Sequence, residues 1–359
     1  MTPICRIVLG LACVASCSDD APAGFITEHL IVEPTDSDVV CRGTLDNLEA
    51  QLVRVAAALD VEVLAPIEVY YGPSAVVEHC TSIPGVHVGG CTKGFGAEIV
   101  VASEFSSLYH EIVHAVRRSN GMRGPSFFEE GIAEVLGAFR PLAFRVTANA
   151  EQIPTARGPA ALVRSPDTYI GPDEYGIAAH FMAWLIATQG QETVAAFLKD
   201  TRLADAADEA FADHFAVSLD DAELDWRATS DSQYTLGDVC DPARGLAWSG
   251  DALEYSAQLA CDAPHVIGPA PDHITIRSAC FPIEQAGLVN VRLVAASGEL
   301  TLRHQGDCVP VGPLSAEHYQ DKRMAAGDTI DAPFAPCTWE VIVTTTLASP
   351  TDFTLRLSR

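Results

Sequence analysis

The sequence predicts an α+β domain followed by a small, disulfide-stapled all-β sandwich domain. Apolar residues recur at helical spacing up to about residue 234, and short alternating runs separated by Gly, Pro and Asp follow that point. The chain has 359 residues, enough for two domains, and its 48% of hydrophobic residues can build a sizeable core. We therefore expect one domain at 28–234 and a second domain at 235–359.

The chain is strongly acidic. It carries 48 Asp and Glu residues against 22 Lys and Arg residues, which gives a net charge of −26. Such a surface repels nucleic acid and anionic lipid headgroups. We therefore expect no nucleic-acid partner, and contact with a membrane only through an attached lipid.

The N-terminus has the pattern of a secretory signal peptide, which we place at 1–16. Arg6 precedes an apolar run at 7–15 that is too short to span a bilayer. The run ends in Val14-Ala15-Ser16-Cys17, which resembles a bacterial lipobox and implies cleavage before Cys17 and lipidation of its thiol. Cleavage without a lipid is the alternative. Residues 17–27 would be a polar tether, which anchors the protein to a membrane of the cell envelope, or leaves it secreted.

Four elements are expected before residue 105. Alternation predicts strands at 28–33, 67–71 and 97–102, and the spacing of Leu and Val predicts a helix at 44–59. Thr44 is the expected N-cap of that helix, because a Thr hydroxyl can accept from the free N–H groups at a helix start.

The central motif is His110-Glu111-Ile112-Val113-His114, on an apolar background that favours a helix. Residues four apart lie on one helix face, so His110 and His114 can bind one Zn²⁺ ion. Glu111 lies beside them and can accept a proton from a water molecule on that ion. The alternative interpretation is two hydrogen-bonded histidines on a surface helix.

A second motif follows at 126–134, with the letters Ser-Phe-Phe-Glu-Glu-Gly-Ile-Ala-Glu. His-Glu-x-x-His followed by an aromatic residue and Glu-Gly-x-Ala resembles the gluzincin zinc metallopeptidases of the peptidase MA type. The resemblance implies a zincin-like fold for the first domain and a third zinc ligand on the next helix. It assigns that ligand to Glu130, with Glu129 and Glu134 as alternatives. The interpretation without a metal is an acidic first helical turn, which the helix dipole favours.

The segment from Tyr175 to Leu185 resembles the gluzincin helix whose tyrosine hydrogen-bonds the oxyanion. The resemblance makes Tyr175 a catalytic residue, and a half-buried aromatic residue at a helix start is the alternative. His180 is expected to pack inside this helix rather than to reach the site. The resemblance also makes the strand at 97–102 the sheet edge to which an extended substrate adds. No Gly-x-Met-Glu-Asn segment of the aminopeptidase branch is found, which puts exopeptidase action in doubt.

Periodicity divides the rest of the chain. Helices are expected at 175–188, 192–198, 204–215 and 220–227, and strands at 274–277, 289–293, 300–303, 339–344 and 353–357. The strands indicate an antiparallel β-sandwich, similar in pattern to the small jelly-roll modules of secreted proteases. Such a module binds substrate or a surface, or stabilises the enzyme.

The cysteines indicate an oxidising compartment. Of eleven, Cys5 and Cys13 leave with the signal peptide and Cys17 would carry the lipid, so eight remain. An even number behind a signal peptide predicts disulfides, and the short spacing favours a Cys80–Cys91 pair. Three of the eight precede the site and five follow residue 239, so at least one bridge joins the two regions if all pair. A structural zinc knuckle is not expected, because no Cys-x-x-Cys occurs.

Together these motifs predict a zinc-dependent endopeptidase that acts on a polypeptide substrate. The alternative is a non-catalytic surface lipoprotein that uses a gluzincin fold as a binding scaffold, since a fold does not fix the chemistry.

The lipid anchor can be tested with Cys17→Ala. The variant is expected to move from the membrane fraction to the soluble fraction, because the thiol that carries the acyl chains is gone. Fractionation with immunodetection measures this, and Cys13→Ala, whose cysteine leaves with the signal peptide, is the control. Wild-type protein with no acyl chain on Cys17 by intact-mass analysis would contradict the prediction.

Overall fold

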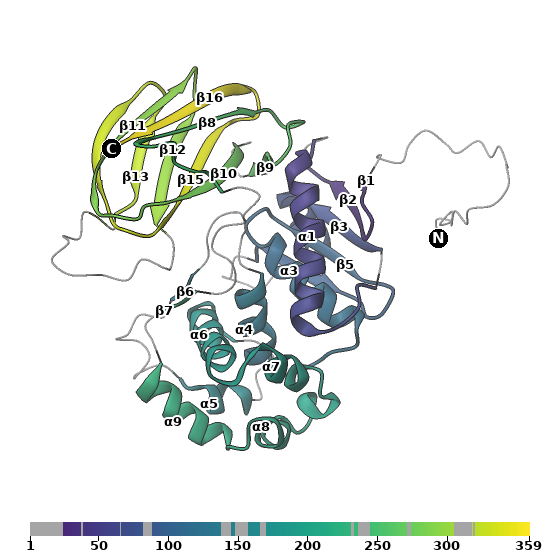
Figure 1. Ribbon diagram of the computed structural model, residues 1–359. Helices are drawn as coiled ribbons and strands as arrows, with labels where there is room; N and C mark the ends of the chain where they lie inside the picture. The colour runs from purple at the N-terminus through teal and green to yellow at the C-terminus, as the bar shows by residue number, and fades with distance from the viewer. Residues whose placement is uncertain are drawn as a thin grey trace, which may run out of the picture.

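The computed structural model describes residues 24–36, 39–64, 66–81, 88–137, 145–147, 157–165, 170–230, 233–235, 245–270, 274–304, 318 and 320–359. The predicted signal peptide, Cys17 and most of the predicted tether lie outside these residues. Within the described ranges, no helix is long and apolar enough to cross a membrane. The fold is mixed α+β, with a helical region built on one sheet and a β-sandwich at the other end of the molecule (Figure 1).

The first sheet has five strands in the order β1-β2-β3-β5-β4. Its three central strands are parallel, and its two edge strands pair antiparallel with their neighbours. Buried and exposed residues alternate in β3, which lets the strand cover a core on one face. The strands are β1 (Phe25–Ile26), β2 (Leu30–Pro34), β3 (Ile67–Tyr71), β5 (Val100–Ser103) and β4 (Gly90–Lys93).

Two predictions about this sheet are wrong. Phe25 and Ile26 already pair with β2, so the fold begins before residue 28. The edge strand is β4 and not the strand predicted at 97–102, because β4 pairs on the open side of β5. A disulfide between Cys80 and Cys91, with an S–S distance of 2.06 Å, ties the start of β4 to the end of α2, as the short spacing led us to expect.

The helices of this region cover the sheet and pack on one another around a single core. That core is rich in fully buried aromatic rings, including Phe127, Phe128, Phe181 and Phe211. A short ribbon of β6 (Arg145–Thr147) and β7 (Gln233–Thr235) closes the region, so it extends through the boundary predicted at residue 234. The helices are α1 (Arg42–Leu59), α2 (Pro73–His79), α3 (Leu108–Ser119), α4 (Ser126–Leu136), α5 (Pro159–Val163), α6 (Pro172–Gln189), α7 (Gln191–Leu198), α8 (Ala207–Phe215) and α9 (Leu219–Thr229), with a 3₁₀ turn at Thr201–Ala204.

The second region is an antiparallel β-sandwich, as predicted. One sheet has the order β13-β12-β15-β10-β9 and the other β14-β11-β16-β8, with Phe281, Phe334, Trp339 and Phe353 buried between them. Each of the five strands expected from alternation lies within one of these strands, while four others carried no clear signal. The strands are β8 (Ala252–Leu259), β9 (Ile267–Ala270), β10 (Ile274–Pro282), β11 (Gly287–Ala295), β12 (Glu299–His304), β13 (Lys322–Ala325), β14 (Thr329–Phe334), β15 (Thr338–Thr346) and β16 (Thr351–Ser358).

The sandwich region caps the start of α1. A Cys41–Cys261 disulfide joins the two regions, as the cysteine count predicted, and Cys280 and Cys337 are disulfide-bonded as well. The backbone N–H groups of Arg42 and Gly43 donate to carbonyls of the loop between β8 and β9. These N–H groups are the ones that a helix start leaves free, so the second region completes the first.

Thr44 is not the N-cap, which corrects the prediction. The N-cap is Cys41, and Thr44 is fully buried one turn further into the helix. Its hydroxyl donates to the carbonyl of Gly268 (2.9 Å) and accepts from the N–H of the same residue (2.8 Å). The hydroxyl serves the neighbouring region because the loop carbonyls already satisfy the helix start.

The contribution of this contact to stability can be measured with Thr44→Val. The change removes the hydroxyl that accepts from the buried N–H of Gly268, while the Gly268 carbonyl keeps the Cys41 N–H as a donor. The free energy of unfolding is therefore expected to fall by about 1–3 kcal/mol. Urea unfolding with the disulfides intact measures it. Thr188→Val is the control, because Thr188 is exposed and its hydroxyl donates only to carbonyls of its own helix, those of Trp184 and Leu185. Equal stability of the two variants would contradict the prediction.

Candidate metal centre

The centre is built on α3, whose apolar face packs into the core. Ile112, Val113, Ala115 and Val116 are buried, which fixes the rotation of the helix. His110 and His114 then lie one turn apart on the other side, with 3.0 Å between their Nε2 atoms. The two imidazoles therefore aim at one point.

Glu130 reaches the same point from α4. Its Oε2 lies 3.0 Å from Nε2 of His110 and 3.2 Å from Nε2 of His114. Donors about 2.0 Å from a tetrahedral ion are themselves about 3.3 Å apart, close to this triangle. The three residues that the sequence singled out therefore come together and could hold one metal ion.

The other two candidate glutamates have different partners. Glu129 forms a two-pronged ion pair with Arg117 of α3, at 2.7 and 2.9 Å, and Arg117 is fully buried. Glu134 lies 3.0 Å from Nδ1 of His110. A carboxylate on the second nitrogen of a ligand histidine fixes its ring and its tautomer. Glu134 thus supports the centre from outside, and Glu129 holds α4 on α3.

Close helix packing brings α4 to the histidines and to α6. A Cβ atom at Gly131 would lie 2.7 Å from the carbonyl oxygen of Ala178 on α6, and one at Gly137 would lie 2.6 Å from Cα of His110. Both contacts are shorter than real Cβ atoms make, so only glycine permits this spacing. In the Glu-Gly pair of the motif, Glu130 is thus a candidate ligand and Gly131 allows α4 to pack closely on α6.

Tyr175 lies at the start of α6, beside the centre. Its ring stacks near that of His110, with the centroids 6.1 Å apart, and its hydroxyl hydrogen-bonds Glu130. Burial, together with the charges of Glu130 and Glu111, raises the pKa of the phenol well above its usual range. The hydroxyl therefore stays protonated and can act as a hydrogen-bond donor.

His180 lies one and a half turns further along α6 and away from the centre. It is fully buried, and its Nδ1 accepts a hydrogen bond of 3.0 Å from the indole of Trp226. It is a packed core residue, as predicted.

The centre strongly favours positive charge. Burial alone would lower the pKa of His110, but hydrogen bonds to Glu130 and Glu134 and the charge of Glu111 raise it to about 10. Burial alone would raise the pKa of Glu130, but the charge of His114 and the hydrogen bonds from both histidines hold it well below its usual range. A cation, either a proton or a metal ion, is therefore stabilised between these side chains.

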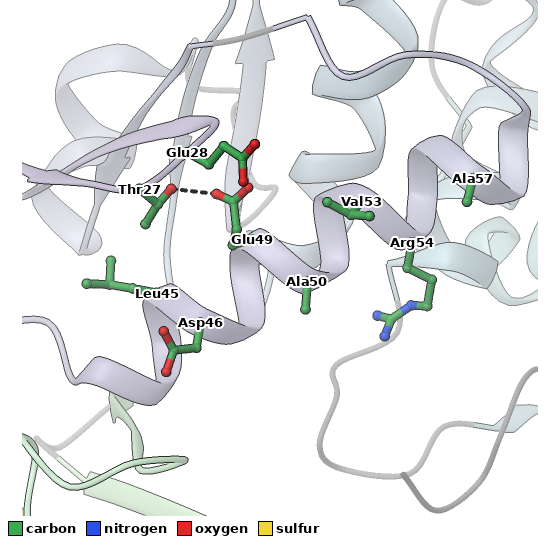
Figure 2. Close-up of a pocket in the computed structure, with 9 residues that line it drawn as sticks. All are labelled: Thr27, Glu28, Leu45, Asp46, Glu49, Ala50, Val53, Arg54 and Ala57. Carbon is green, nitrogen blue, oxygen red and sulfur yellow. Dashed lines mark hydrogen bonds between the residues drawn. The ribbon is translucent and has the colours of Figure 1, made fainter. Parts of the chain in front are cut away.

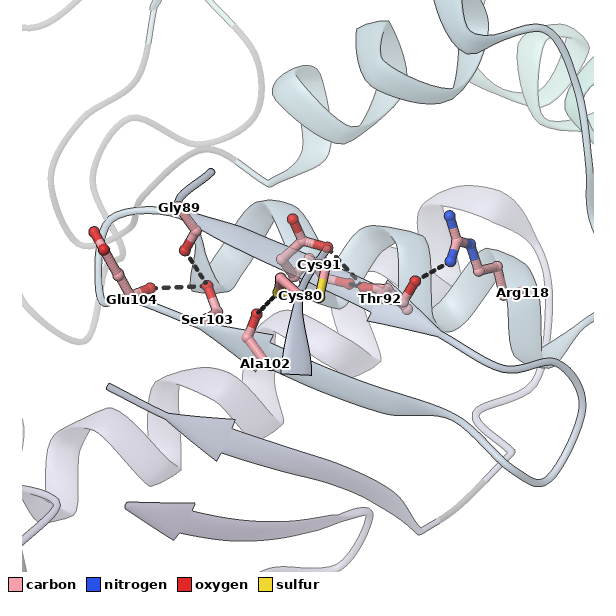
Figure 3. The surroundings of a disulfide bond; sticks show 9 residues. Cys80, Gly89, Cys91, Thr92, Ala102, Ser103, Glu104 and Arg118 are labelled. Carbon is pink, nitrogen blue, oxygen red and sulfur yellow. Dashed lines mark hydrogen bonds between the residues drawn. A yellow bond between two sulfur atoms is a disulfide. The ribbon is translucent and has the colours of Figure 1, made fainter. Parts of the chain in front are cut away.

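Glu111 is positioned by the edge strand β4, through a residue that the sequence did not point to. The Thr92 hydroxyl lies 2.8 Å from Oε2 of Glu111, and both residues are buried. At Gly90, on the same face of β4, a Cβ atom would lie 2.7 Å from Cγ of Glu111. Figure 3 shows Thr92 directly after the Cys80–Cys91 bridge, which fixes this part of β4.

A second group of potential ligands, Glu28, His29 and Glu49, lies where the turn between β1 and β2 meets α1. Glu28 and Glu49 line an open groove there (Figure 2). Here Nδ1 of His29 is hydrogen-bonded to Glu49, which also accepts from the Thr27 hydroxyl at 2.5 Å. These contacts bind the β1–β2 hairpin to α1 and account for the cluster, so we assign it no metal.

Comparisons with known proteins leave the family open. No protein-family description matches the chain, and no curated protein matches it. Among solved structures, the pre-peptidase C-terminal domain of a collagenase from Bacillus anthracis is similar over 32% of this chain and 89% of that domain, at 18% identity and a TM-score of 0.19. A similarity at this level carries no argument about function, which has to come from the centre itself.

The three neighbouring glutamates should respond differently to replacement by Gln. Glu130→Gln is expected to lose most affinity for Zn²⁺, because two histidines alone make a weak site. Glu134→Gln should lose about 10-fold, the lower end for a residue that supports a ligand. Glu129→Gln should keep its affinity but lose about 3 kcal/mol of stability, because Arg117 is left buried and unpaired.

Competition with a chromophoric chelator measures the zinc affinities, and urea unfolding measures the stabilities. Glu209→Gln, on α8, is a control for the loss of one charge. A fall in affinity for Glu129→Gln that equals the fall for Glu130→Gln would contradict this assignment of roles.

Proposed function

We propose that this protein is a zinc-dependent endopeptidase, with a gluzincin-like first domain of zincin-like fold. One observation carries the proposal: the donor atoms of His110, His114 and Glu130 converge, and the carboxylate of Glu111 is close enough for its charge to raise the pKa of His110. Two imidazoles and one carboxylate are a donor set used by catalytic zinc, which keeps its fourth position open. The outer carboxylate of Glu134 on His110 supports the same assignment.

The chemistry divides between the ion and the chain. Zn²⁺ held by the three ligands supplies Lewis acidity, which activates water and polarises the carbonyl of a peptide bond. Glu111 takes the proton from the attacking water and delivers it to the leaving amine, and Thr92 holds its carboxylate in position. Tyr175, which stays protonated, donates to the oxyanion that forms on the carbonyl oxygen.

The polypeptide substrate pairs with β4 in this proposal. Glu104 N–H donates to the carbonyl of Gly89 at 2.8 Å, which makes residues 89, 91 and 93 the ones that bond to β5. The backbone N–H and C=O groups of Gly90 and Thr92 therefore point away from β5, to the outer edge of the described sheet, where the Thr92 carbonyl already accepts one hydrogen bond from Arg118. A peptide that binds as one more strand uses backbone hydrogen bonds and needs little sequence preference. We further propose that the protein is anchored by a lipid on Cys17 in the cell envelope.

Three variants test the chemistry. His114→Ala is expected to lose most bound zinc, because two protein ligands remain. Glu111→Gln should keep zinc and lose activity, because the amide cannot accept the proton. Tyr175→Phe should keep zinc and lose about 10²-fold in kcat, the typical effect of one oxyanion donor. Zinc stoichiometry beside the rate of cleavage of an unstructured protein substrate measures all three.

The control is Tyr70→Phe, which removes a phenol hydroxyl on β3, in the sheet and outside the centre. If Glu111→Gln cleaves the substrate at the wild-type rate, the proposed protease function is wrong. Wild-type protein that binds no zinc after metal loading would equally contradict that function, and would favour a non-catalytic scaffold.

A further inference from the structure

We propose that a carboxylate-binding subsite, formed by Arg118, Arg123 and Phe95, selects peptides with an acidic residue on the N-terminal side of the cleaved bond. The inference rests on the proposed function, because it places this subsite at the end of the strand β4 that pairs with substrate. We call these three residues the Arg-Phe-Arg patch.

Contacts within the protein hold the three side chains of the patch together. Phe95 lies between two glycines of positive φ in the turn after β4, and 46% of its surface is exposed. The guanidinium carbon of Arg123 lies 3.8 Å from the centre of the ring, and that of Arg118 lies 5.9 Å from it. The N–H of Gly96 donates to the carbonyl of Arg118 at 3.2 Å, which ties this turn to the end of α3. The aromatic ring thus presents two cations side by side.

The charges of the two arginines are the second feature of the patch. Neither forms an ion pair with a carboxylate of the described part of the chain, although the protein has 48 acidic residues and only 22 basic ones. Two like charges at one ring repel each other, and a carboxylate placed between them relieves that repulsion. Guanidinium groups bind carboxylates through two parallel hydrogen bonds, so a carboxylate is the ligand that fits.

The position of the patch points to a peptide side chain. Arg118 donates to the carbonyl of Thr92 (Figure 3), a group on the side of β4 that faces away from β5. A peptide whose scissile bond lies near Glu111, beside Gly90, has residues two to four positions away next to Arg118, at about 3.4 Å per residue. Antiparallel pairing, the more stable arrangement, makes these the residues before the scissile bond.

An anionic membrane is the less suitable ligand. Lipid-binding patches gather about four to eight Lys and Arg residues, and this patch has two. The net charge of −26 also opposes approach to an anionic surface. For the same reason an acidic peptide is repelled by most of the surface, so a local pair of cations decides where its carboxylate binds.

The test uses two fluorescein-labelled peptides of one sequence, with Glu or Gln at positions two to four before a central Ala-Ala bond. Binding is measured by anisotropy to the zinc-loaded, full-length Glu111→Gln protein, so that it does not depend on cleavage. We expect the Glu peptide to bind about 5- to 10-fold more tightly at low salt, and high salt to reduce the preference. Adding Arg123→Gln should bring the preference to about 2-fold or less, because one of two charges remains.

Arg359→Gln is the matched control. Arg359 also stacks over an aromatic ring, that of Trp248, at 4.3 Å, but in the β-sandwich, so its loss should leave the preference unchanged. The inference is overturned if the two peptides bind equally or if neither binds. It is also overturned if Arg123→Gln and Arg359→Gln change the preference by the same amount. Arginine-dependent binding to vesicles of phosphatidylcholine with phosphatidylglycerol in the absence of any peptide preference would overturn it as well.

The outcomes separate this inference from the proposed function. Wild-type protein that cleaves both peptides at one rate, with equal binding, is a protease without this subsite. A Glu preference in binding with no cleavage of either peptide keeps the subsite and removes the protease function.

Discussion

The candidate metal centre depends on how closely α4 is held between α3 and α6. The buried ion pair of Arg117 and Glu129 fixes α4 on α3, and the contact of Gly131 with Ala178 fixes it on α6. Interior packing is too dense to let one helix shift alone. A shift of α4 away from α3 would take the carboxylate of Glu130 out of contact with His110 and His114. The positions of His110, His114 and Glu130 relative to one another thus depend on helix packing, in which Arg117, Glu129, Gly131 and Ala178 take part.

Helical periodicity predicted that His110 and His114 share one helix face. The choice of Glu130 as the third candidate ligand came from the resemblance of the Glu-Gly motif to the gluzincins, and not from periodicity. Choosing among Glu129, Glu130 and Glu134 on physical grounds required the angle between two helices. The packing of α3 against α4 brings Arg117 to Glu129, and it brings His110 to Glu130 and Glu134. No local sequence pattern encodes this packing.

The residues that were missed depend on contacts between distant parts of the chain. β4 has the letters Gly-Cys-Thr-Lys, which carry no apolar alternation, so only its pairing with β5 and the Cys80–Cys91 bridge make it a strand. Thr92 could not be linked to Glu111 without that register. Thr44 was misassigned for a similar reason: its partner Gly268 lies 224 residues further along the chain. A local rule for helix starts fails where another region supplies the cap.

Electrostatics connects the centre to the rest of the surface. Glu111, Glu130 and Glu134 surround two imidazoles, and the raised pKa of His110 means that without a metal ion the centre holds a proton at neutral pH. If the centre binds a divalent ion as proposed, that ion has to displace the proton, so its affinity is expected to rise with pH until His110 is neutral. A divalent ion carries two positive charges and the proton carries one, so the net charge of −26 favours replacement of the proton by the ion. A net charge of this sign also attracts divalent cations, and the Arg-Phe-Arg patch is a local pair of positive charges near the end of β4.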